Sequence, residues 1–310
     1  MKAVRFHEYG GIEVLQYEDV DRPQPGPGEV LVHVAGTAFN PVDIGFRVGY
    51  LHDYYPVTFP QTIGLDLAGT VVEQGEGVDV PAVGDPVIGF MPMTRPGAAA
   101  EFAAVRADAL VSAPGNVALA DAAAIPVAAL TAWQALFEHG GLASGQRVLV
   151  NGAGGGVGGF TVQLAKRAGA TVIATASARS AETVRSFGAD EVIDYTLVKI
   201  GDAVRGPVDL VVNLVAGSPD DSAALLDLIK SGGVLVSVPP GLEYPERDVQ
   251  VKSFGVRSDT GQLAQIVAQV EAGTLLLDIS DRRPLAETPL VHEQSQSGSV
   301  RGRVVLVPPS

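Results

Sequence analysis

Apolar residues in the first hundred positions occur in short runs that are separated by glycine, proline and aspartate. Runs of this length, bounded by turn residues, are typical of β-strands joined by tight turns. They predict strands at 3–6, 14–17, 30–35, 67–72, 86–90 and 101–105. Many short strands at such spacing indicate a small barrel or sandwich. From about residue 119 the chain becomes rich in alanine, which favours helix.

A second pattern covers residues 147–238, where apolar runs alternate with helical stretches. The runs predict strands at 148–150, 171–175, 191–193, 210–214 and 234–238, with helices at 157–168, 181–187 and 222–230 between them. Continuous apolar strands that alternate with helices are typical of a parallel sheet covered on both faces, so the fold class is α/β. A further helix is expected at 262–272. The closing segment "RVVLVPP" resembles the first domain, and we expect it to return there.

Composition and charge narrow the class of protein. The chain of 310 residues is 46% hydrophobic and carries a net charge of −14, which argues against a nucleic-acid partner. It contains no cysteine, which removes disulfides, thiolate nucleophiles and zinc sites built on sulfur. The start, "MKAVRFHEYG", has no apolar core of a signal peptide. The apolar stretch 122–137 contains Pro126 and is short for a membrane span, so we expect a cytoplasmic protein without a membrane partner.

The segment "NGAGGGVGGF" at 151–160 has the features of a phosphate-binding turn. It follows the predicted strand "RVLV" and opens a predicted helix with an apolar stripe. In such a turn the free amides and the helix dipole favour an anion, and side chains would block its approach. Ala153, Gly155 and Gly158 occupy the three glycine positions of G-x-G-x-x-G. This context predicts dinucleotide binding.

The same segment resembles the cofactor loop of the zinc-independent quinone oxidoreductases of the medium-chain dehydrogenase/reductase superfamily. Further agreement is found in "MKAVRFHEYGG", "NPVDIGFR", "GADEVIDY" and "RGRVVL", in order along the whole chain. The resemblance implies a GroES-like β-barrel domain built from both chain ends, residues 1–118 and 258–310. It also implies a Rossmann-type doubly wound domain at 119–257 that binds NADP, and a homodimer formed through an edge strand near 249–256.

The metal-binding positions of related alcohol dehydrogenases are altered. In "TIGLDLAG", Leu65 stands where a zinc-binding histidine would be, and five histidines remain without helix-ligand spacing. No zinc is therefore expected. Asp66 is read as a structural carboxylate or as a catalytic one. Without a Lewis acid, reduction of a quinone or an α,β-unsaturated carbonyl is favoured, because the developing charge spreads over a conjugated system.

The resemblance places substrate-side residues in "NPVDIGFRVGYLHDYY". It implies that Asn40, Asp43, Arg47 and Tyr50 line the catalytic cleft. Arg47 or Tyr50 could donate a hydrogen bond to the acceptor oxygen, and Tyr50 could pass a proton. In the alternative interpretation, Asp43 and Arg47 pair with each other and fix the loop.

The resemblance also implies a set of cofactor-binding residues that extends beyond the glycine loop. These are Thr131, Gly152, Ala153, Gly155, Gly156, Val157, Gly158, Tyr195, Leu214, Val238, Pro239, Gly241, Val256 and Arg301.

The segment after the second predicted strand indicates which cofactor is used. In NAD enzymes an acidic residue at this point binds the ribose 2′-hydroxyl. Here the strand runs into "ASARS", where Ser177 and Arg179 suit a 2′-phosphate, so NADPH is expected to be preferred over NADH. The alternative is that Arg179 is a solvated residue at a helix start.

Two other functions remain open at this point. An enoyl-thioester reductase would share the fold and the hydride chemistry, but it would need a basic rim for its polyanionic carrier, and this chain is acidic. A cofactor-binding sensor or structural protein without turnover is the second alternative. The quinone or enone reductase, acting on a small molecule, is the principal prediction.

Overall fold

The computed structural model describes residues 1–239 and 244–309, and the chain divides into two compact units. The first unit combines both chain ends, as Met1–Ala128, Ser258–Thr274 and Ile279–Ser310. The second unit contains Ala129–Arg257 and Leu275–Asp278. Both segments that the sequence assigns to a barrel domain therefore contribute to one unit, except that Leu275–Asp278 of the second segment belongs to the other unit.

The first unit extends beyond the boundary predicted at 118/119. Helix α2 (Leu119–Ala122) packs on strands of this unit. The carboxylate of Asp66 accepts a hydrogen bond from the amide of Val127 (2.7 Å), at the start of α3 (Pro126–Trp133). These tertiary contacts hold the alanine-rich stretch to the first unit as far as Ala128.

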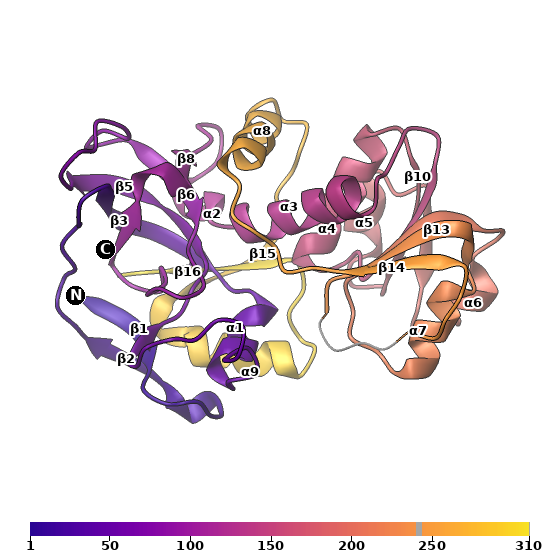
Figure 1. Ribbon diagram of the computed structural model, residues 1–310, viewed down its shortest axis with the longest axis horizontal. Coiled ribbons are helices and arrows are strands. Elements are labelled where there is room, and N and C mark those ends of the chain that lie inside the picture. Colours follow the sequence, from indigo (N-terminus) through magenta and orange to yellow (C-terminus); the bar gives the residue numbers. More distant parts are fainter. Residues whose placement is uncertain (240–243, 310) are drawn as a thin grey trace. The chain divides into compact units, whose positions relative to one another are not determined.

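Strand β3 (Glu29–Ala38) is central to the first unit (Figure 1). It pairs antiparallel with β5 (Asp66–Gln74) and, on its other side, with β7 (Phe102–Arg106). The sheet order is β15-β16-β3-β5-β6-β8, and a smaller sheet has the order β2-β1-β4. Further strands of the unit are β1 (Lys2–Phe6), β2 (Leu15–Asp19), β4 (Gln61–Thr62), β6 (Pro86–Phe90), β8 (Leu110–Ser112), β15 (Ile279–Pro284) and β16 (Arg303–Val307). Its helices include α1 (Pro41–Arg47), α8 (Thr260–Glu271) and α9 (Thr288–Gln296).

The end of the chain returns to the first unit, as the sequence predicts. Strand β16 pairs with the end of β3, where Val305 lies opposite Ala38. Residues of β16, including Val304 and Leu306, share a buried apolar cluster with Phe6 near the N-terminus. This closure brings Arg303 beside residues from the first third of the chain.

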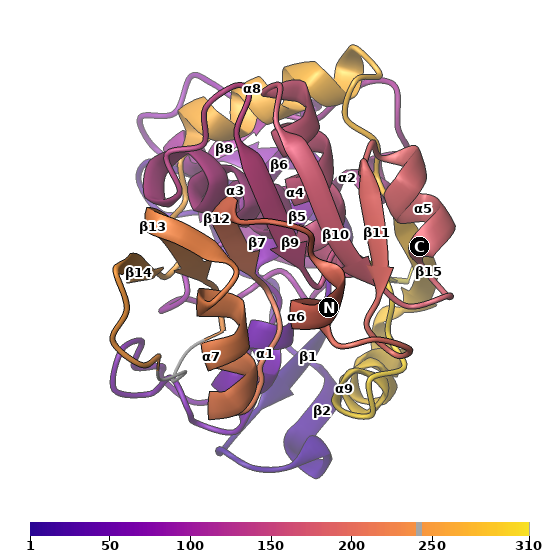
Figure 2. The same cartoon turned by 90° about the vertical axis from the view of Figure 1, so that its right-hand side faces the viewer.

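The second unit is built around a parallel sheet with the order β11-β10-β9-β12-β13-β14 (Figure 2). Its strands are β9 (Arg147–Asn151), β10 (Thr171–Ala176), β11 (Glu191–Asp194), β12 (Val208–Asn213), β13 (Ile229–Ser237) and β14 (Val249–Ser253). Its helices include α4 (Gly156–Arg167), α5 (Ala181–Ser186), α6 (Ile200–Ala203) and α7 (Pro219–Leu226). The strand order reverses between β9 and β12, which is where doubly wound folds bind their ligands.

Side chains alternate between the two faces of this sheet. Leu149, Ile173 and Leu235 join a buried cluster with residues of α6 and α7. Helix α4 packs on β9 and β10, and α5 packs on β10 and β11. The continuous apolar strands of the sequence are explained by this arrangement, because both of their faces are covered.

One predicted helix was wrong in its extent. The stretch predicted as helix at 222–230 forms α7, which ends at Leu226, and β13 already begins at Ile229. Ile229 pairs with Val208 ahead of an irregularity in the register. The last residues of the predicted helix therefore belong to a strand of the sheet. The short helix α1 and helix α9 had no counterpart in the predicted elements.

The sequence predicts that the apolar stretch 122–137 is too short for a membrane span. The structure shows a helical run, Leu119–His139, that is long and apolar enough to cross a membrane by length and composition. Of an apolar stretch of 18 residues within this run, 78% is buried inside the protein. That burial is typical of a core helix.

Candidate functional site

The glycine-rich segment forms the turn between β9 and α4. Gly152, directly after β9, has φ +93°, a conformation that favours glycine. Its amide donates to Thr175 Oγ1 (2.9 Å), and the amide of Ala153 donates to the Thr175 carbonyl (3.0 Å). Helix α4 then begins at Gly156 with Gly155 as its N-cap. The loop is thus fixed against β10, while the first amides of α4 have no acceptor within the helix.

The glycines of this loop serve different purposes. A β-carbon at Gly158 would lie 2.4 Å from the carbonyl oxygen of Gly152, so glycine is needed there for close packing of α4. A β-carbon at Gly154 would lie 2.2 Å from Ser180 Oγ. At Gly155 the nearest atom would be 3.5 Å away. Gly155 therefore leaves free space at the N-terminus of α4, where a phosphate is favoured.

The segment after β10 lies beside this loop, because Ser180 approaches Gly154. The carbonyl of Ser177 accepts hydrogen bonds from the amides of Ser180 and Ala181 (3.0 Å each), which turns the chain into α5. Arg179 is exposed, and "ASARSA" contains no carboxylate. Serine and arginine side chains here can donate to a phosphate, and no acidic side chain of this segment would repel it.

Other predicted cofactor residues follow the carboxyl ends of neighbouring strands. Tyr195 follows β11 and is 52% exposed, and Leu214 follows β12. Val238 and Pro239 follow β13, and the amide of Val238 donates to the Asn213 carbonyl (3.0 Å). Because the strands are parallel, their carboxyl ends meet at one edge of the sheet. The structure thus brings these residues to the same edge as the glycine loop.

The remaining four residues of the predicted cofactor set are not placed at this edge by the contacts of the second unit. Thr131 is buried within α3, and Val256 is partly buried after β14. Arg301 belongs to the first unit, directly before the bridge that leads into β16. Gly241 lies outside the described residues. A role of these four in cofactor binding stays a prediction.

Sequence reasoning missed a row of polar side chains along the same edge. Thr175, Asn151, Asn213 and Ser237 stand at or near the ends of β10, β9, β12 and β13, and Tyr244 joins them. The available signal was a polar residue that closes an apolar run, as in "RVLVN" and "DLVVN".

Two predicted substrate-side residues, Asn40 and Asp43, lie in a buried polar network of the first unit. Asp43 Oδ2 accepts from the Asn40 amide (2.9 Å), which caps the start of α1. Asn40 Nδ2 donates to Asp66 Oδ2 (2.8 Å). Arg303 donates to Asn40 Oδ1 (2.8 Å) and pairs with Asp66 Oδ2 (2.5 Å). Asp66 also accepts from the amide at the start of α3, so its structural interpretation is supported.

The network holds two carboxyl groups and one guanidinium. Burial raises the pKa of Asp43 to about 7, and the negative charge of Asp66 acts in the same direction. Arg303 and the Asn40 amide act against this shift. Burial also raises the pKa of Asp66, and the charge of Arg303 and the hydrogen bonds from the Val127 amide and Asn40 act against that shift.

Arg47 is also buried, with an exposed fraction of 0%. Its guanidinium donates to the Gly10 carbonyl (3.2 Å) and to Gln296 Oε1 (3.3 Å), so the alternative pairing with Asp43 is not what the structure shows. The same interior holds His292, whose ring nitrogens have no hydrogen-bond partner among the described residues. Burial lowers the pKa of His292 to about 3, and the positive charge of Arg47 contributes.

Tyr50 differs from the other three substrate-side candidates. It lies just beyond α1 and is 57% exposed. Tyr50 is thus largely exposed to solvent, whereas Asn40, Asp43 and Arg47 are buried and hydrogen-bonded to other residues.

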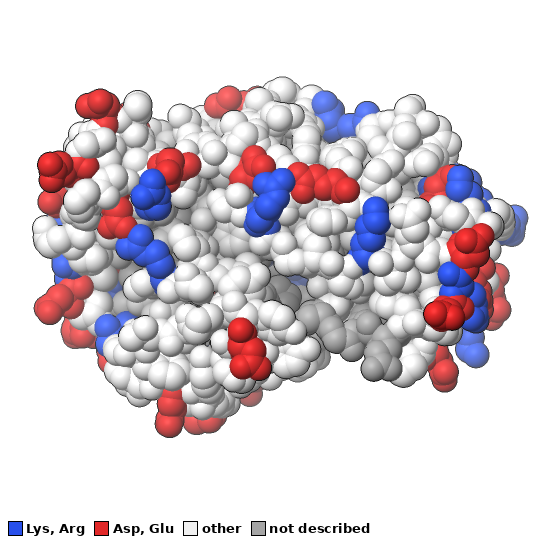
Figure 3. All heavy atoms as spheres, viewed as in Figure 1, with Lys and Arg blue, Asp and Glu red and all other residues white. Residues whose placement is uncertain are grey.

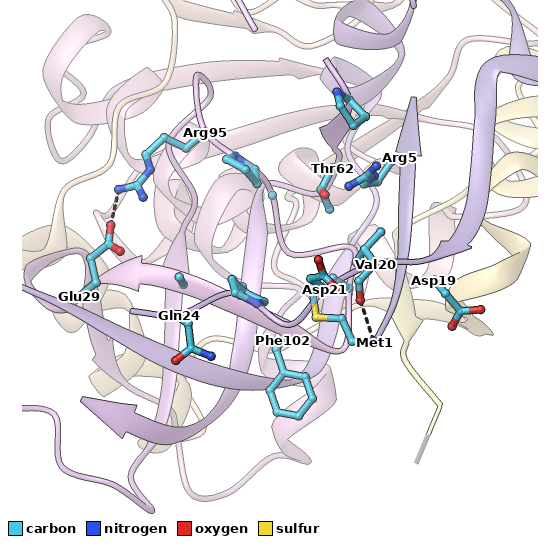
Figure 4. Close-up of a pocket in the computed structure, with 17 residues that line it drawn as sticks. Met1, Arg5, Asp19, Val20, Asp21, Gln24, Glu29, Thr62, Arg95 and Phe102 are labelled. Atoms are coloured by element: carbon cyan, nitrogen blue, oxygen red, sulfur yellow. Dashed lines mark hydrogen bonds and ion pairs between the residues drawn. The ribbon is translucent and has the colours of Figure 1, made fainter. Parts of the chain in front are cut away.

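A pocket of about 690 Å³ opens elsewhere on the first unit (Figure 4). Its lining comes from β1, β4, β7 and the segments near Asp21 and Arg95. Arg95 is paired with Glu29 (2.5 Å), as Figure 4 shows, and Arg5 is paired with Glu18 (2.6 Å). Arg95 and Arg5 of this pocket are thus already in ion pairs with residues of the protein. None of the predicted site residues lines the pocket.

Two domain families match this chain. An alcohol dehydrogenase GroES-like domain matches residues 26–115, and a zinc-binding dehydrogenase domain matches residues 187–306. The chain is 33% identical over 327 residues to a chloroplast envelope quinone oxidoreductase homolog of Arabidopsis thaliana, covering 99% of this chain and 98% of that protein. The chain belongs to the quinone oxidoreductase family of the medium-chain dehydrogenase/reductase superfamily.

Other relatives agree with this assignment. A 2-methylene-furan-3-one reductase of Solanum lycopersicum is 32% identical over 324 residues, covering 99% of this chain and 79% of that protein. A mycobacterial protein solved in complex with NADPH is 28% identical, with a TM-score of 0.88 and coverage of 99% and 100%. They confirm the predicted α/β fold with a Rossmann-type sheet and a GroES-like domain, and the protein is an oxidoreductase of the quinone oxidoreductase type.

One of the two matching domains is a zinc-binding dehydrogenase domain, but the side chains of this quinone oxidoreductase family member do not provide the ligands of a zinc site. The chain has no cysteine, and Leu65 is a buried apolar residue. Within residues 1–239 and 244–309, no group of three His, Asp or Glu side chains is arranged to hold a metal ion. Asp66, beside Leu65, is occupied by Arg303, Asn40 and the start of α3.

Proposed function

We propose that the protein is an NADPH-dependent reductase of quinones or α,β-unsaturated carbonyl compounds that works without zinc. The observation that carries the proposal is the carboxyl edge of the second unit. There the open position at Gly155 lies at the start of α4, next to a segment with Ser177 and Arg179 and no carboxylate. When bound, NADPH supplies the hydride for the reaction.

The cofactor would be held by this chain at two points. The amides at the start of α4 would bind the pyrophosphate, because they lack intrahelical acceptors and lie at the positive end of the helix dipole. Ser177 and Arg179 would bind the 2′-phosphate through charge-assisted hydrogen bonds. The NADPH complex of the mycobacterial relative supports this assignment.

The lack of suitable zinc ligands determines which hydride acceptors we propose. A conjugated acceptor distributes the charge of the added hydride, whereas an isolated ketone concentrates it on one oxygen and needs a stronger electrophile. The names of two relatives, a quinone oxidoreductase homolog and a furanone reductase, support acceptors of both kinds. We propose Tyr50 as the proton donor, because it is the exposed residue among the four substrate-side candidates. Asn40, Asp43 and Arg47 would then support the segment that carries it.

The test is oxidation of NADPH with panels of quinones, enones and simple ketones, with the metal content of the purified protein measured alongside. We expect turnover with quinones or enones, little with simple ketones, and no effect of a chelator. Stoichiometric zinc that is lost together with activity would overturn the metal-free reaction, as would efficient oxidation of simple secondary alcohols.

The same panel separates the alternatives. An enoyl-thioester reductase would turn over a thioester best, but on the face shown in Figure 3 the Lys and Arg side chains are scattered among Asp and Glu rather than gathered into a rim. A binding protein would bind NADPH in a titration and oxidise it with none of these acceptors. Either outcome would replace the proposed acceptor class.

We also propose a homodimer formed through β14. This strand is last in the sheet order, and its exposed residues include Val251 (41%). An edge strand presents unpaired backbone groups to a second copy. Light scattering of the purified protein should give twice the chain mass, and Val251→Lys should shift it to the monomer.

A further inference from the structure

A row of hydrogen-bonded polar side chains crosses the carboxyl edge of the second unit. We call Thr175, Asn151, Asn213, Tyr244 and Ser237 the edge ladder. Thr175, Asn213 and Ser237 have exposed fractions of 1%, 2% and 0%. Polar groups buried to this degree are costly unless each has a partner, so the bonds between them define the arrangement.

The bonds of the edge ladder run in one direction. The hydroxyl of Thr175 donates to Asn151 Oδ1 (2.8 Å), and Asn151 Nδ2 donates to Asn213 Oδ1 (2.9 Å). Asn213 Nδ2 donates to the hydroxyl of Tyr244 (3.1 Å), which donates to Ser237 Oγ (3.0 Å). Each hydroxyl has one proton to give, so these partners fix the orientation of both amides. Bonds aligned in this way strengthen one another.

The two ends of the edge ladder reach backbone of the cofactor edge. At one end Thr175 Oγ1 accepts from the amide of Gly152 in the glycine loop (2.9 Å). At the other end Ser237 Oγ donates to the carbonyl of Pro239, which follows β13 (3.4 Å). The bond between Asn151 and Asn213 spans β9 and β12, where the strand order reverses. In doubly wound folds the two halves on either side of this point each take one mononucleotide of a dinucleotide.

We propose that the edge ladder is a positioning element that fixes the two mononucleotide-binding halves relative to each other, with Tyr244 as its decisive link. This inference rests on the proposed use of NADPH. Among the described residues, the hydroxyl of Tyr244 connects Asn213 to Ser237. The effect of the edge ladder should be confined to ligands that reach both halves of the edge.

The test is calorimetric titration of the full-length protein with NADPH and with 2′,5′-ADP, which contains only the adenosine half. Tyr244→Phe removes the linking hydroxyl while keeping the ring. We expect NADPH to bind about five- to tenfold more weakly, the equivalent of one lost hydrogen bond, with 2′,5′-ADP affected less than about twofold. Thr175→Val, at the end that holds the glycine loop, should weaken both ligands.

Tyr17→Phe is the matched control, because it makes the same change in the first unit, on β2. If Tyr244→Phe does not fold, Ser237→Ala breaks the same link and should give the same selective loss. Equal loss of both ligands, or no loss in either variant, would overturn the edge ladder as a positioning element. Failure of the unmodified protein to bind NADPH would instead overturn the proposed function, so the two failures are distinguishable.

Discussion

The two units each contain a buried polar network, and the networks differ in charge. In the first unit, the three ionisable side chains Asp43, Asp66 and Arg303 form a cluster with Asn40. In the second unit the edge ladder consists of hydroxyls and amides. A charged network stabilises only while its charges balance, whereas a neutral one needs only its hydrogen bonds. We infer that the first network serves stability and the second serves ligand binding.

The difference also appears in what each network connects. Arg303 reaches Asn40 and Asp66 from the opposite end of the chain, at sequence separations of 263 and 237 residues. The first network therefore closes the barrel unit. The edge ladder connects the ends of neighbouring strands beside the glycine loop. Four predictions test this division, from the largest expected effect to the smallest.

The first prediction removes the cation of the buried network. Arg303→Leu should lower the free energy of unfolding by about 3–5 kcal/mol, because it leaves Asp66 buried without its partner. Denaturant unfolding measures the loss. Arg282→Leu is the control, since the pair of Arg282 with Asp121 is bidentate but Arg282 is largely exposed, and its loss should cost less than about 1 kcal/mol. Similar losses of unfolding free energy in Arg303→Leu and Arg282→Leu would contradict a stabilising role specific to the buried network.

The second prediction concerns pH and uses Asp43 and His292. The pKa of Asp43 is raised from 3.8 to about 7, so between these values the folded state binds more protons than the unfolded state and stability falls as pH rises. The pKa of His292 is lowered from 6.5 to about 3, so there the unfolded state binds more protons and stability rises with pH. The two contributions oppose each other between about pH 4 and pH 6.5.

Removing either group should expose the slope of the other. Relative to the unmodified protein, Asp43→Asn should gain stability as pH rises from 4 to 7, and His292→Phe should lose it from 3 to 6.5, each at up to about 1.4 kcal/mol per pH unit. The phenylalanine breaks no hydrogen bond, since the described residues offer the ring nitrogens no partner. Denaturant unfolding across this range measures both slopes. If the stability difference between a variant and the unmodified protein does not change with pH, the substituted group does not contribute to the pH dependence.

The third prediction tests the second unit. Arg179→Ala should weaken NADPH binding by about tenfold to a hundredfold, since a hydrogen bond to a charged group contributes about 1.5–3 kcal/mol. NADH has no 2′-phosphate, so its affinity should hardly change. Arg185→Ala, an exposed arginine of α5, is the control and should change neither. Titration of both cofactors decides, and equal losses for NADH and NADPH would place Arg179 outside the site.

The fourth prediction separates two glycines of the loop. Gly158→Ala should lower the free energy of unfolding by about 1–3 kcal/mol, because the new β-carbon would meet the Gly152 carbonyl at 2.4 Å. Gly155→Ala should leave stability unchanged and weaken NADPH binding, because the nearest protein atom is 3.5 Å away. Thermal unfolding and titration measure the two effects. A destabilised Gly155→Ala variant with unchanged affinity would contradict the open position.

Much of the second unit could be predicted from the sequence. Its strands and the glycine loop are encoded locally, since apolar runs of strand length and a glycine-rich turn before an apolar stripe are readable within short windows. The end of α7 was less readable, because pairing of Ile229 with Val208 decides where β13 begins. Local periodicity does not contain that pairing.

By itself, the sequence determined the α/β class, the return of the chain's end to the first unit, and the position of the glycine loop. Only the tertiary structure decided that Asn40 and Asp43 belong to a buried network with Arg303, and that Arg47 is enclosed beside His292. It also decided that polar residues at or near the ends of four strands form one hydrogen-bonded row with Tyr244. The physical reason is range. Periodicity reports which side of an element is apolar, whereas the partner of a buried polar group depends on segments far away along the chain.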